Sequence, residues 1–400
     1  MDNLERLRMF LSNPIELLDS LARSGPGIQR SHIGHKAFIF VFNAQAAREI
    51  LVTYADAFGK NDTILKKITP ITGEHGLVQL EGKASQEVRK KSRAIFSQDN
   101  LAHLQAVIEE IALSYVSSIP NDRAIAIDEL MTELILNTAF RIFLGVNYKD
   151  SSKKVGQEFL RLNHICGNRI NQLISLPLWL PSRQNKEIIA LKNSIRGFIL
   201  STLKQETSKQ EKNIVNLFSK SPHIIDQCMT FLFAGHETTA SSLAFTFLLL
   251  TRYAHYQDRI ANDFIFTKAI YQESLRLYPP AYMVTKKAKK NTSIQGLNIY
   301  KGDQIIIAIK QIHNSHTYFK DPHIFDPNRF IDCHHNPAFM PFSLGNKSCV
   351  GERLAYLEAC IILQIFCKNF YIEPVGHSIE TEQLITLHPK SGQKIKFSKR

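Results

Sequence analysis

Apolar residues recur at helical spacing over two long stretches of the 400-residue chain. The first runs from about Ile224 to Arg252. The second follows Gly351 and reads Glu-Arg-Leu-Ala-Tyr-Leu-Glu-Ala-Cys-Ile-Ile-Leu-Gln-Ile-Phe. Shorter runs rich in β-branched and aromatic residues predict strands near Ala37–Phe42, Asp303–Ala308 and Lys394–Phe397. The pattern predicts a mainly α-helical protein with small β-sheets.

The composition favours a single large domain. Hydrophobic residues make up 44% of the chain, enough to bury a sizeable core. Length alone would permit two or three domains, but the sequence contains no linker, repeat or low-complexity run. We therefore expect one domain over residues 1–400.

The segment Phe342-Ser-Leu-Gly345-Asn-Lys-Ser-Cys349-Val-Gly351 places one cysteine between two glycines, just before a predicted helix. Gly345 permits a tight turn, and Gly351 permits close approach by a flat, bulky group. A cysteine at a helix N-terminus is expected to have a lowered thiol pKa, which prepares it to bind a metal. Taken alone, such a cysteine is more often an inert core residue.

The helical run from Ile224 to Arg252 is interrupted by the polar sequence Ala234-Gly235-His236-Glu237-Thr238-Thr239. Glycine, an acid and two threonines are poor choices for a helix interior, so something other than helix stability selects them. The alternative is a simple polar notch in a core helix.

A third feature is Glu273-Ser-Leu-Arg276, which precedes Tyr278-Pro279-Pro280. A spacing of three places both charged side chains on one helix face. Considered in isolation, this is an exposed ion pair worth a few tenths of a kcal/mol.

Together these segments resemble, in the same order, the motifs of the cytochrome P450 family. The resemblance extends to Ala355 and Glu358 after the cysteine loop, and to Phe325-Asp-Pro-Asn-Arg329-Phe330, where Asn328 replaces the family's glutamate. It implies the cytochrome P450 fold, with haem b held between an oxygen-binding helix and the cysteine loop. Cys349 would be the iron ligand. Neighbouring haem contacts would come from Phe342, Gly345, Gly351, Ala234 and Gly235.

The resemblance also implies roles for the polar and charged residues. Thr238 would hydrogen-bond the oxygen species at the iron, and Glu237 would relay protons from solvent, beside a local opening of the helix. Glu273, Arg276 and Arg329 would form a buried network that fixes the cysteine loop.

The expected contacts to the haem propionates depart from the family pattern. Arg89 matches the arginine of a Trp-x-x-x-Arg motif, whereas Ser85 replaces its tryptophan. Lys286 stands where the family usually has Arg. Lys347 stands where the family has Arg or His. Lysine keeps the charge but lacks the bidentate fork of arginine, so we expect weaker haem retention. A basic, solvated helix face is the alternative interpretation of residues 81–93.

The implied reaction is monooxygenation, either hydroxylation or epoxidation, of an apolar small molecule. Since the chain carries no flavin or iron–sulfur motif, electrons would come from a separate ferredoxin or flavodoxin with its NAD(P)H reductase. Three alternatives stay open: a peroxide-using enzyme, which typically lacks the pair Glu237 and Thr238; an isomerase-type or dehydratase member; and a non-catalytic haem-binding protein.

The substrate pocket is expected to be lined by the loop from Asp62 to Leu77, residues from about Leu160 to Leu180, Phe231 with Phe233, Ala281–Thr285, and Leu384–Thr386. The segment between His255 and Glu273 is shorter than the family's usual two-helix excursion.

The formal net charge is +13, from 49 basic and 36 acidic residues. No nucleic-acid motif accompanies it, and the basic cluster Arg89, Lys90, Lys91 and Arg93, near Arg353, instead suggests a docking face for an acidic electron donor. No apolar run is long enough to span a bilayer, and the N-terminus is too charged for a signal peptide.

The six cysteines show no disulfide framework. With no predicted membrane anchor, we expect a cytoplasmic, monomeric enzyme of the bacterial type. Cys333-His334-His335 invites a metal-site interpretation, but a second ligand pair at zinc spacing is missing.

Overall fold

The computed structural model describes residues 2–25, 27–34, 36–148, 150–170, 172, 175–204, 212–331, 336–376 and 378–400. Cys333-His334-His335 lies outside this range. The α-helices are α1 Asn3–Ser12, α2 Pro14–Ser24, α3 Ala44–Arg48, α4 Asp62–Thr72, α5 Gly82–Ser92, α6 Gln98–Ser118, α7 Ile127–Ala139, α8 Asp150–Ile170, α9 Arg183–Leu203, α10 Ile214–Leu217, α11 Ile224–Arg252, α12 Gln257–Asn262, α13 Phe264–Leu277, α14 Ile309–His313 and α15 Glu352–Asn369.

Short π-helical turns are η1 Glu49–Thr53 and η3 Phe140–Leu144, and 3₁₀ turns are η2 Ala55–Ala57, η4 Ala254–Tyr256, η5 Pro327–Phe330 and η6 Gly345–Lys347. The strands are β1 Ile28–Ile33, β2 Lys36–Val41, β3 Phe58–Lys60, β4 Arg123–Ala126, β5 Val284–Ala288, β6 Thr292–Ile294, β7 Leu297–Ile299, β8 Gln304–Ile307, β9 Phe370–Pro374, β10 Thr381–Gln383, β11 Leu387–Pro389 and β12 Lys394–Lys399.

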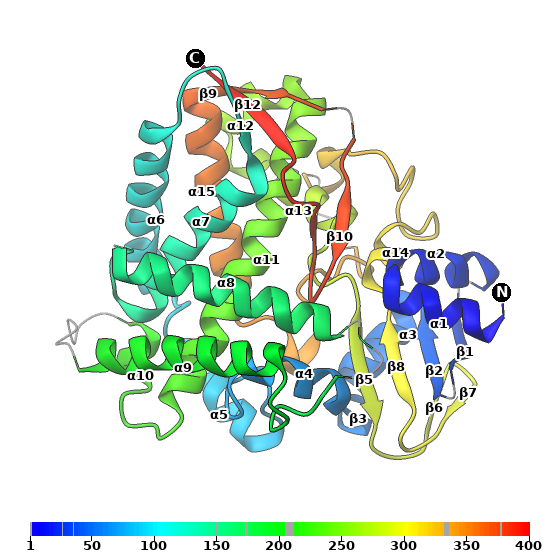
Figure 1. Cartoon of the computed structure of the whole chain (residues 1–400). Helices are drawn as coiled ribbons and strands as arrows, with labels where there is room; N and C mark the ends of the chain where they lie inside the picture. Colours follow the sequence, from blue (N-terminus) through cyan, green and yellow to red (C-terminus); the bar gives the residue numbers. More distant parts are fainter. Residues whose placement is uncertain are drawn as a thin grey trace.

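A large helical region and a smaller sheet region lie side by side (Figure 1). The long helix α11 runs through the helical region and packs against α7, α13 and α15. Its residues are buried on almost every side, which explains why its apolar pattern is nearly continuous. The largest hydrophobic core surrounds this helix.

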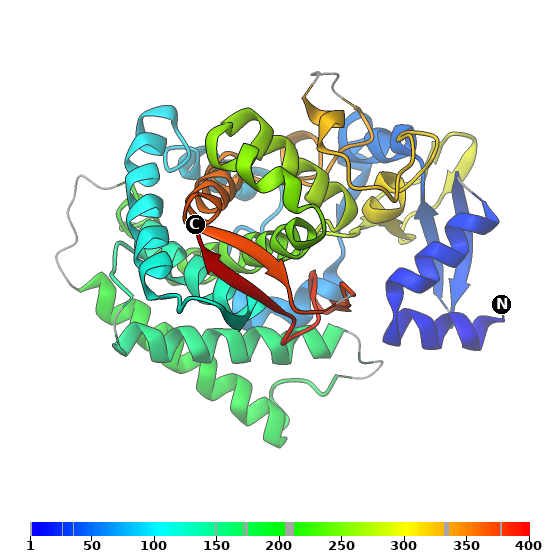
Figure 2. The same ribbon diagram turned by 90° about the horizontal axis from the view of Figure 1, so that it is seen from above.

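The main sheet has the strand order β1-β2-β8-β5-β3. Strands β2 and β8 pair in parallel, with Ile39 opposite Ile305 and Val41 opposite Ile307, and the other pairs are antiparallel. Helices α1 and α2 lie next to this sheet (Figures 1 and 2). A second sheet, β4-β12-β9, joins the C-terminus to the helical region.

The mainly helical fold with small sheets is confirmed, including the helices at 224–252 and after Gly351 and the three predicted strands. The expectation of a loop from Asp62 onward is wrong, because α4 occupies residues up to Thr72 and is capped at its start by the Asn61 side chain. The short segment before Glu273 forms η4, α12 and the first turns of α13. None of the described helices is both long and apolar enough to cross a bilayer.

Candidate functional site

The cysteine loop is a tight turn that ends on helix α15. The backbone N–H of Cys349 donates to the Phe342 carbonyl over 2.9 Å. Gly345 has a φ of +72°, and a Cβ there would lie 2.8 Å from the Leu51 carbonyl oxygen. Glycine is therefore required for the turn, as the sequence predicts. Gly351 precedes α15 directly, and a Cβ there would meet nothing closer than 3.9 Å.

The Cys349 thiol faces internal space. The residue has accessible surface because it lines cavities, although protein atoms surround it densely. Burial raises the pKa of the thiol; the Gly351 N–H and Arg89 oppose this rise, and Glu352 adds to it. The predicted lowering of the thiol pKa is therefore wrong for the protein alone, since desolvation outweighs the helix terminus two residues away. A bound metal cation would itself favour the thiolate.

Two largely apolar cavities meet at Cys349. One has a volume of about 360 Å³ and the other about 440 Å³, and Ala234, Gly235, Phe143 and Gly351 line both. Further lining residues are Ile64, Leu65, Ile68, Leu77, Val78, Phe96, Thr230, Phe231, Phe233, Ala281, Met283, Val284, Thr285, Ile385 and Thr386. Most of the predicted pocket segments therefore reach the cavities. The described part of 160–180 does not line them, and Leu160 borders a different cavity.

The middle of α11 passes over this space. Gly235 is needed because a Cβ there would lie 2.5 Å from the Phe143 ring. The Thr238 hydroxyl donates to the Ala234 carbonyl over 2.9 Å, and Thr238 lines the larger cavity. The expected local opening of the helix is absent from this segment, because α11 is continuous from Ile224 to Arg252.

Glu237 lies between two cavities. One carboxylate oxygen accepts a hydrogen bond from the Thr386 hydroxyl at 2.7 Å, while the other is buried without a hydrogen-bond partner among the described residues. Glu237 lines the 440 Å³ cavity and also a more polar cavity of about 380 Å³, to which His164, Glu382 and His388 contribute. The Glu237 carboxyl group is thus placed to contact both the apolar cavity at Cys349 and the more polar cavity.

Glu273, Arg276 and Arg329 form one buried network. Both Glu273 oxygens accept from Arg276, each at 2.7 Å, and Arg329 Nε donates to the same carboxylate at 3.1 Å. Arg276 also donates to the carbonyl of His313, whose Nε2 accepts from the Met340 backbone N–H. Burial lowers the pKa of His313 to about 3, so the ring is neutral and able to accept. The network is therefore linked to the cysteine loop, two residues before Phe342.

Arg89 reaches the cysteine loop from α5. Its guanidinium donates to the carbonyls of Ser348, at 2.7 Å, and Lys347, at 3.2 Å. Its Nε is buried and has no hydrogen-bond partner among the described residues. Ser85, at the position of the family's tryptophan, is buried on the same helix.

Lys60, Lys286 and Lys347 lie near Arg89, and the carboxylate of Glu81 lies among these cations. Lys286 is buried on β5, Lys347 lies 3.6 Å from Glu81, and Lys60 donates to two backbone carbonyls while lining the cavity beside Cys349. Burial and, to a smaller extent, the neighbouring cations lower the pKa of Lys60 to about 7 and that of Lys286 to about 8, against the opposing effect of Glu81. Such a cluster favours an anionic ligand.

These residues fit the haem that the sequence resemblance implies. Cys349 opens onto a cavity, Gly351 leaves space beside it, and the unpaired Nε of Arg89 lies among excess cations that suit carboxylate groups.

Sequence reasoning missed Lys60 and Phe143, and it placed Thr386 in the pocket without its contact to Glu237. Lys60 follows Phe-Gly in a short strand and precedes Asn61 and Asp62, so the local sequence does not mark it as a site residue. Phe143 reaches the site from a distant segment, and no local signal marks it.

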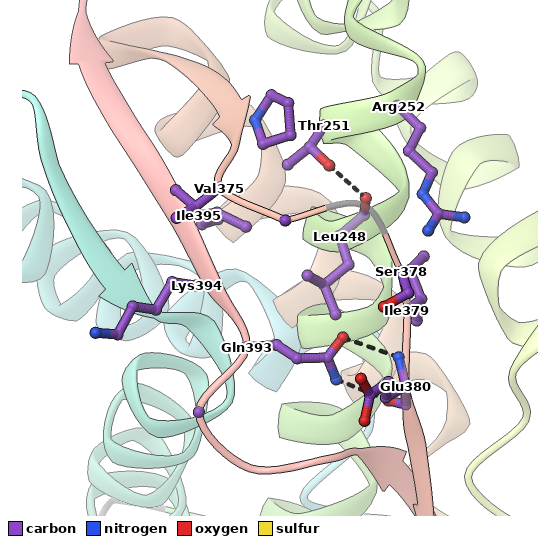
Figure 3. A pocket seen from close by; sticks show the side chains of 13 residues that line it. Leu248, Thr251, Arg252, Val375, Ser378, Ile379, Glu380, Gln393, Lys394 and Ile395 are labelled. Carbon is purple, nitrogen blue, oxygen red and sulfur yellow. Dashed lines mark hydrogen bonds between the residues drawn. The ribbon is translucent and has the colours of Figure 1, made fainter.

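One further recess, of about 310 Å³, lies between the end of α11 and the C-terminal strands (Figure 3). Gln393 hydrogen-bonds the Glu380 backbone across it, and the Thr251 hydroxyl donates to Leu248. It shares no lining residue with the cavities at Cys349, and we assign it no role.

Comparisons with known proteins agree with this geometry. The family model described as Cytochrome P450 matches residues 8–397. A cyclooctat-9-en-7-ol 5-monooxygenase from Streptomyces melanosporofaciens is 23% identical over 90% of this chain and 86% of its own. A cytokinin hydroxylase from Arabidopsis thaliana is 24% identical over 82% and 75%.

Among solved structures, CYP175A1 from Thermus thermophilus superposes with a TM-score of 0.86 at 22% identity, covering 98% of this chain and 97% of that one. This likeness shows the shared fold. Since the family model covers nearly the whole sequence, the chain belongs to the cytochrome P450 family of haem-containing monooxygenases.

Proposed function

We propose that the protein binds haem b through Cys349 and inserts one oxygen atom from O₂ into an apolar small molecule. The observation that carries this proposal is the Cys349 thiol facing an apolar cavity that Thr238 and Glu237 also line. When bound, a thiolate-ligated haem supplies oxygen activation, because the thiolate favours O–O cleavage.

The chain's own residues would position the reactants. The network of Glu273, Arg276 and Arg329 is linked to the cysteine loop, and Arg89, Lys60, Lys286 and Lys347 would bind the carboxylates of the cofactor. The apolar cavity walls bind substrate and exclude water.

Proton supply is assigned to Glu237 and Thr238. The Glu237 carboxyl can take a proton from the polar cavity beside His164 and present it to the cavity at Cys349. The Thr386 hydroxyl holds the carboxyl in that position. The Thr238 hydroxyl, which follows Glu237 on α11 and lines the same cavity, is then the group to which we assign the next proton transfer.

Enzymes of this family need redox partners, and we propose an acidic ferredoxin or flavodoxin. A recess of about 360 Å³ beside Cys349 is lined by Arg89, Arg93 and Arg353. Lys90 is exposed on α5, the helix that carries Arg89, but it does not line the recess. The Lys91 ammonium group lies over the Phe218 ring, 4.9 Å from its centre. Arg93 and Arg353 are therefore better placed than the two lysines to steer an acidic partner.

We also place the enzyme in the cytoplasm. The five cysteines described by the structure are free, which suits a reducing compartment.

An apolar substrate agrees with the cavity lining, and the Streptomyces relative is named for a reaction on cyclooctat-9-en-7-ol.

The proposal is tested with Cys349→Ser. The reduced carbon monoxide complex of the wild type should show the red-shifted absorption of thiolate ligation, and the variant should lose it, because a serine oxygen cannot supply thiolate donation. Retention of that band would remove Cys349 as the ligand. A substrate-dependent rise in NAD(P)H consumption, with a reductase present, would exclude a non-catalytic haem protein.

A further inference from the structure

Glu81, at the start of α5, carries a negative charge within the cation cluster beside Cys349. One of its carboxylate oxygens accepts a hydrogen bond from the Lys60 backbone N–H at 2.7 Å and lies 3.6 Å from the Lys347 ammonium group. The other oxygen lies 3.2 Å from the ammonium group of Lys289. Both oxygens are therefore engaged by groups from three separate segments of the chain.

The Glu81 carboxyl group is ionised near neutral pH. Burial acts to raise its pKa, but the Lys60 N–H bond together with Lys289 and Lys347 outweighs burial and lowers the pKa below its ordinary value. The same negative charge acts in return on Lys60 and Lys286, where it opposes the lowering of the lysine pKa values. Glu81 thus already neutralises part of the cluster.

The Glu81 side chain lies outside the two cavities that meet at Cys349. Lys60 and Arg89 line the cavity of about 360 Å³, and Lys347 lines the cavity of about 440 Å³, whereas Glu81 lines neither. A carboxylate that enters the cluster from the cavity side would therefore meet cations whose charge is already partly neutralised. It would also be repelled by the Glu81 carboxylate.

We propose that Glu81 limits how tightly the protein retains haem, because its charge competes with the two carboxylates of the cofactor for the same cations. This role rests on the proposed function and adds to it a residue that opposes cofactor binding. A like charge close to an anion disfavours the ionised form and weakens its binding. The hydrogen bond from the Lys60 N–H, in contrast, needs only an oxygen acceptor at position 81 and not a charge.

Substitution by glutamine separates the charge from the hydrogen bond. Glu81→Gln keeps an oxygen that can accept from the Lys60 N–H but removes the negative charge. Ferric holoenzyme is mixed with excess apomyoglobin, and haem transfer is followed by absorption. A pH of about 6 lies below the lowered pKa values of Lys60, about 7, and Lys286, about 8, so both lysines are charged.

We expect Glu81→Gln to lose haem about threefold more slowly than the wild type, or slower still, because the repulsion is removed. The difference should shrink in about 1 M salt, where the Debye length is about 3 Å, since the Glu81 side chain is 33% exposed and its charge is partly screened.

Three further variants locate the effect. Glu81→Asp keeps the charge and should lose haem at about the wild-type rate. Glu87→Gln removes the same charge from an exposed position on the same helix and should have no effect. Lys289→Gln removes a half-exposed cation that pairs with Glu81 and lines neither cavity, and it should release haem faster.

Haem loss from Glu81→Gln at or above the wild-type rate would overturn the proposal, since Glu81 would then assemble the cluster and not compete for it. Equal slowing by Glu87→Gln would also overturn it, because a general change of surface charge would explain both results. If Glu81→Gln does not fold, an unchanged rate in Lys289→Gln would overturn the proposal. The proposed function fails by a different result, which is retention of the thiolate band in Cys349→Ser.

Discussion

Replacing Glu273 by glutamine isolates the charge of the buried network. The Glu273 carboxylate has no accessible surface and accepts hydrogen bonds from Arg276, Arg329 and the Asp326 backbone N–H. Glutamine has nearly the same shape. However, its NH₂ group must face an arginine donor, and two guanidinium groups lose their only shared anion.

The expected cost is about 3–5 kcal/mol, the range for removing one partner of a buried ion pair. Arg276 has no accessible side-chain surface, so water cannot compensate it. Arg329→Gln should cost less, about 1–2 kcal/mol, because the Arg329 side chain is 14% exposed and hydrated in part. A protein of ordinary stability, about 5–15 kcal/mol, would be close to unfolding with Glu273→Gln.

Denaturant unfolding of the single variants and of the double variant Glu273→Gln/Arg276→Leu gives the coupling. The double variant removes the fully buried one of the two uncompensated cations together with its partner, so its cost should be well below the sum of the two single costs. Strict additivity, or a cost of Glu273→Gln below about 1 kcal/mol, would refute the network as a source of stability.

The same variants test the link to the ligand loop. The connection from Arg276 through His313 to the Met340 N–H should loosen in Glu273→Gln, and the fraction of haem with thiolate ligation should fall. Arg329→Gln is the matched comparison, because Arg329 bonds the same carboxylate without contacting His313. Equal loss of ligation in both variants would contradict this route.

Three further predictions follow from individual side chains. Thr238→Ala should leave haem binding intact while reducing the product formed per NAD(P)H, with peroxide released instead; unchanged coupling would remove its role. Burial raises the pKa of Glu358 to about 8, above its ordinary 4.5, so the wild type should lose stability relative to Glu358→Gln by about 1.4 kcal/mol per pH unit as pH rises between these values. Parallel pH profiles of thermal unfolding for the two proteins would contradict this. Arg93→Glu with Arg353→Glu should slow reduction by an acidic ferredoxin at low salt, whereas Lys90→Glu, outside the recess, should have a smaller effect.

The sequence could predict those parts of the site that are formed by residues close together in the chain. A tight turn before Cys349 follows from glycine spacing, and the Glu273–Arg276 contact follows from helix geometry. The resemblance indicates a pocket loop at Asp62–Leu77, whereas the local sequence carries the opposing signal of an N-cap at Asn61, which begins the helix Asp62–Thr72. Phe143, which makes Gly235 obligatory, comes from another helix and leaves no local trace in the sequence.

The cation cluster changes the expectation for haem retention. Judged from sequence, lysine in place of arginine at positions 286 and 347 removes two bidentate contacts. The structure adds Lys60, so that five cations, Lys60, Arg89, Lys286, Lys289 and Lys347, gather around the carboxylate of Glu81, which pairs with Lys289 at 3.2 Å. The pKa values of the buried Lys60 and Lys286 are held below the usual range by desolvation and by neighbouring cations, and two incoming carboxylates would offset the repulsion among these cations. The number of converging charges can therefore offset the missing arginine forks, since attraction in a desolvated site depends on net charge as well as on hydrogen-bond geometry.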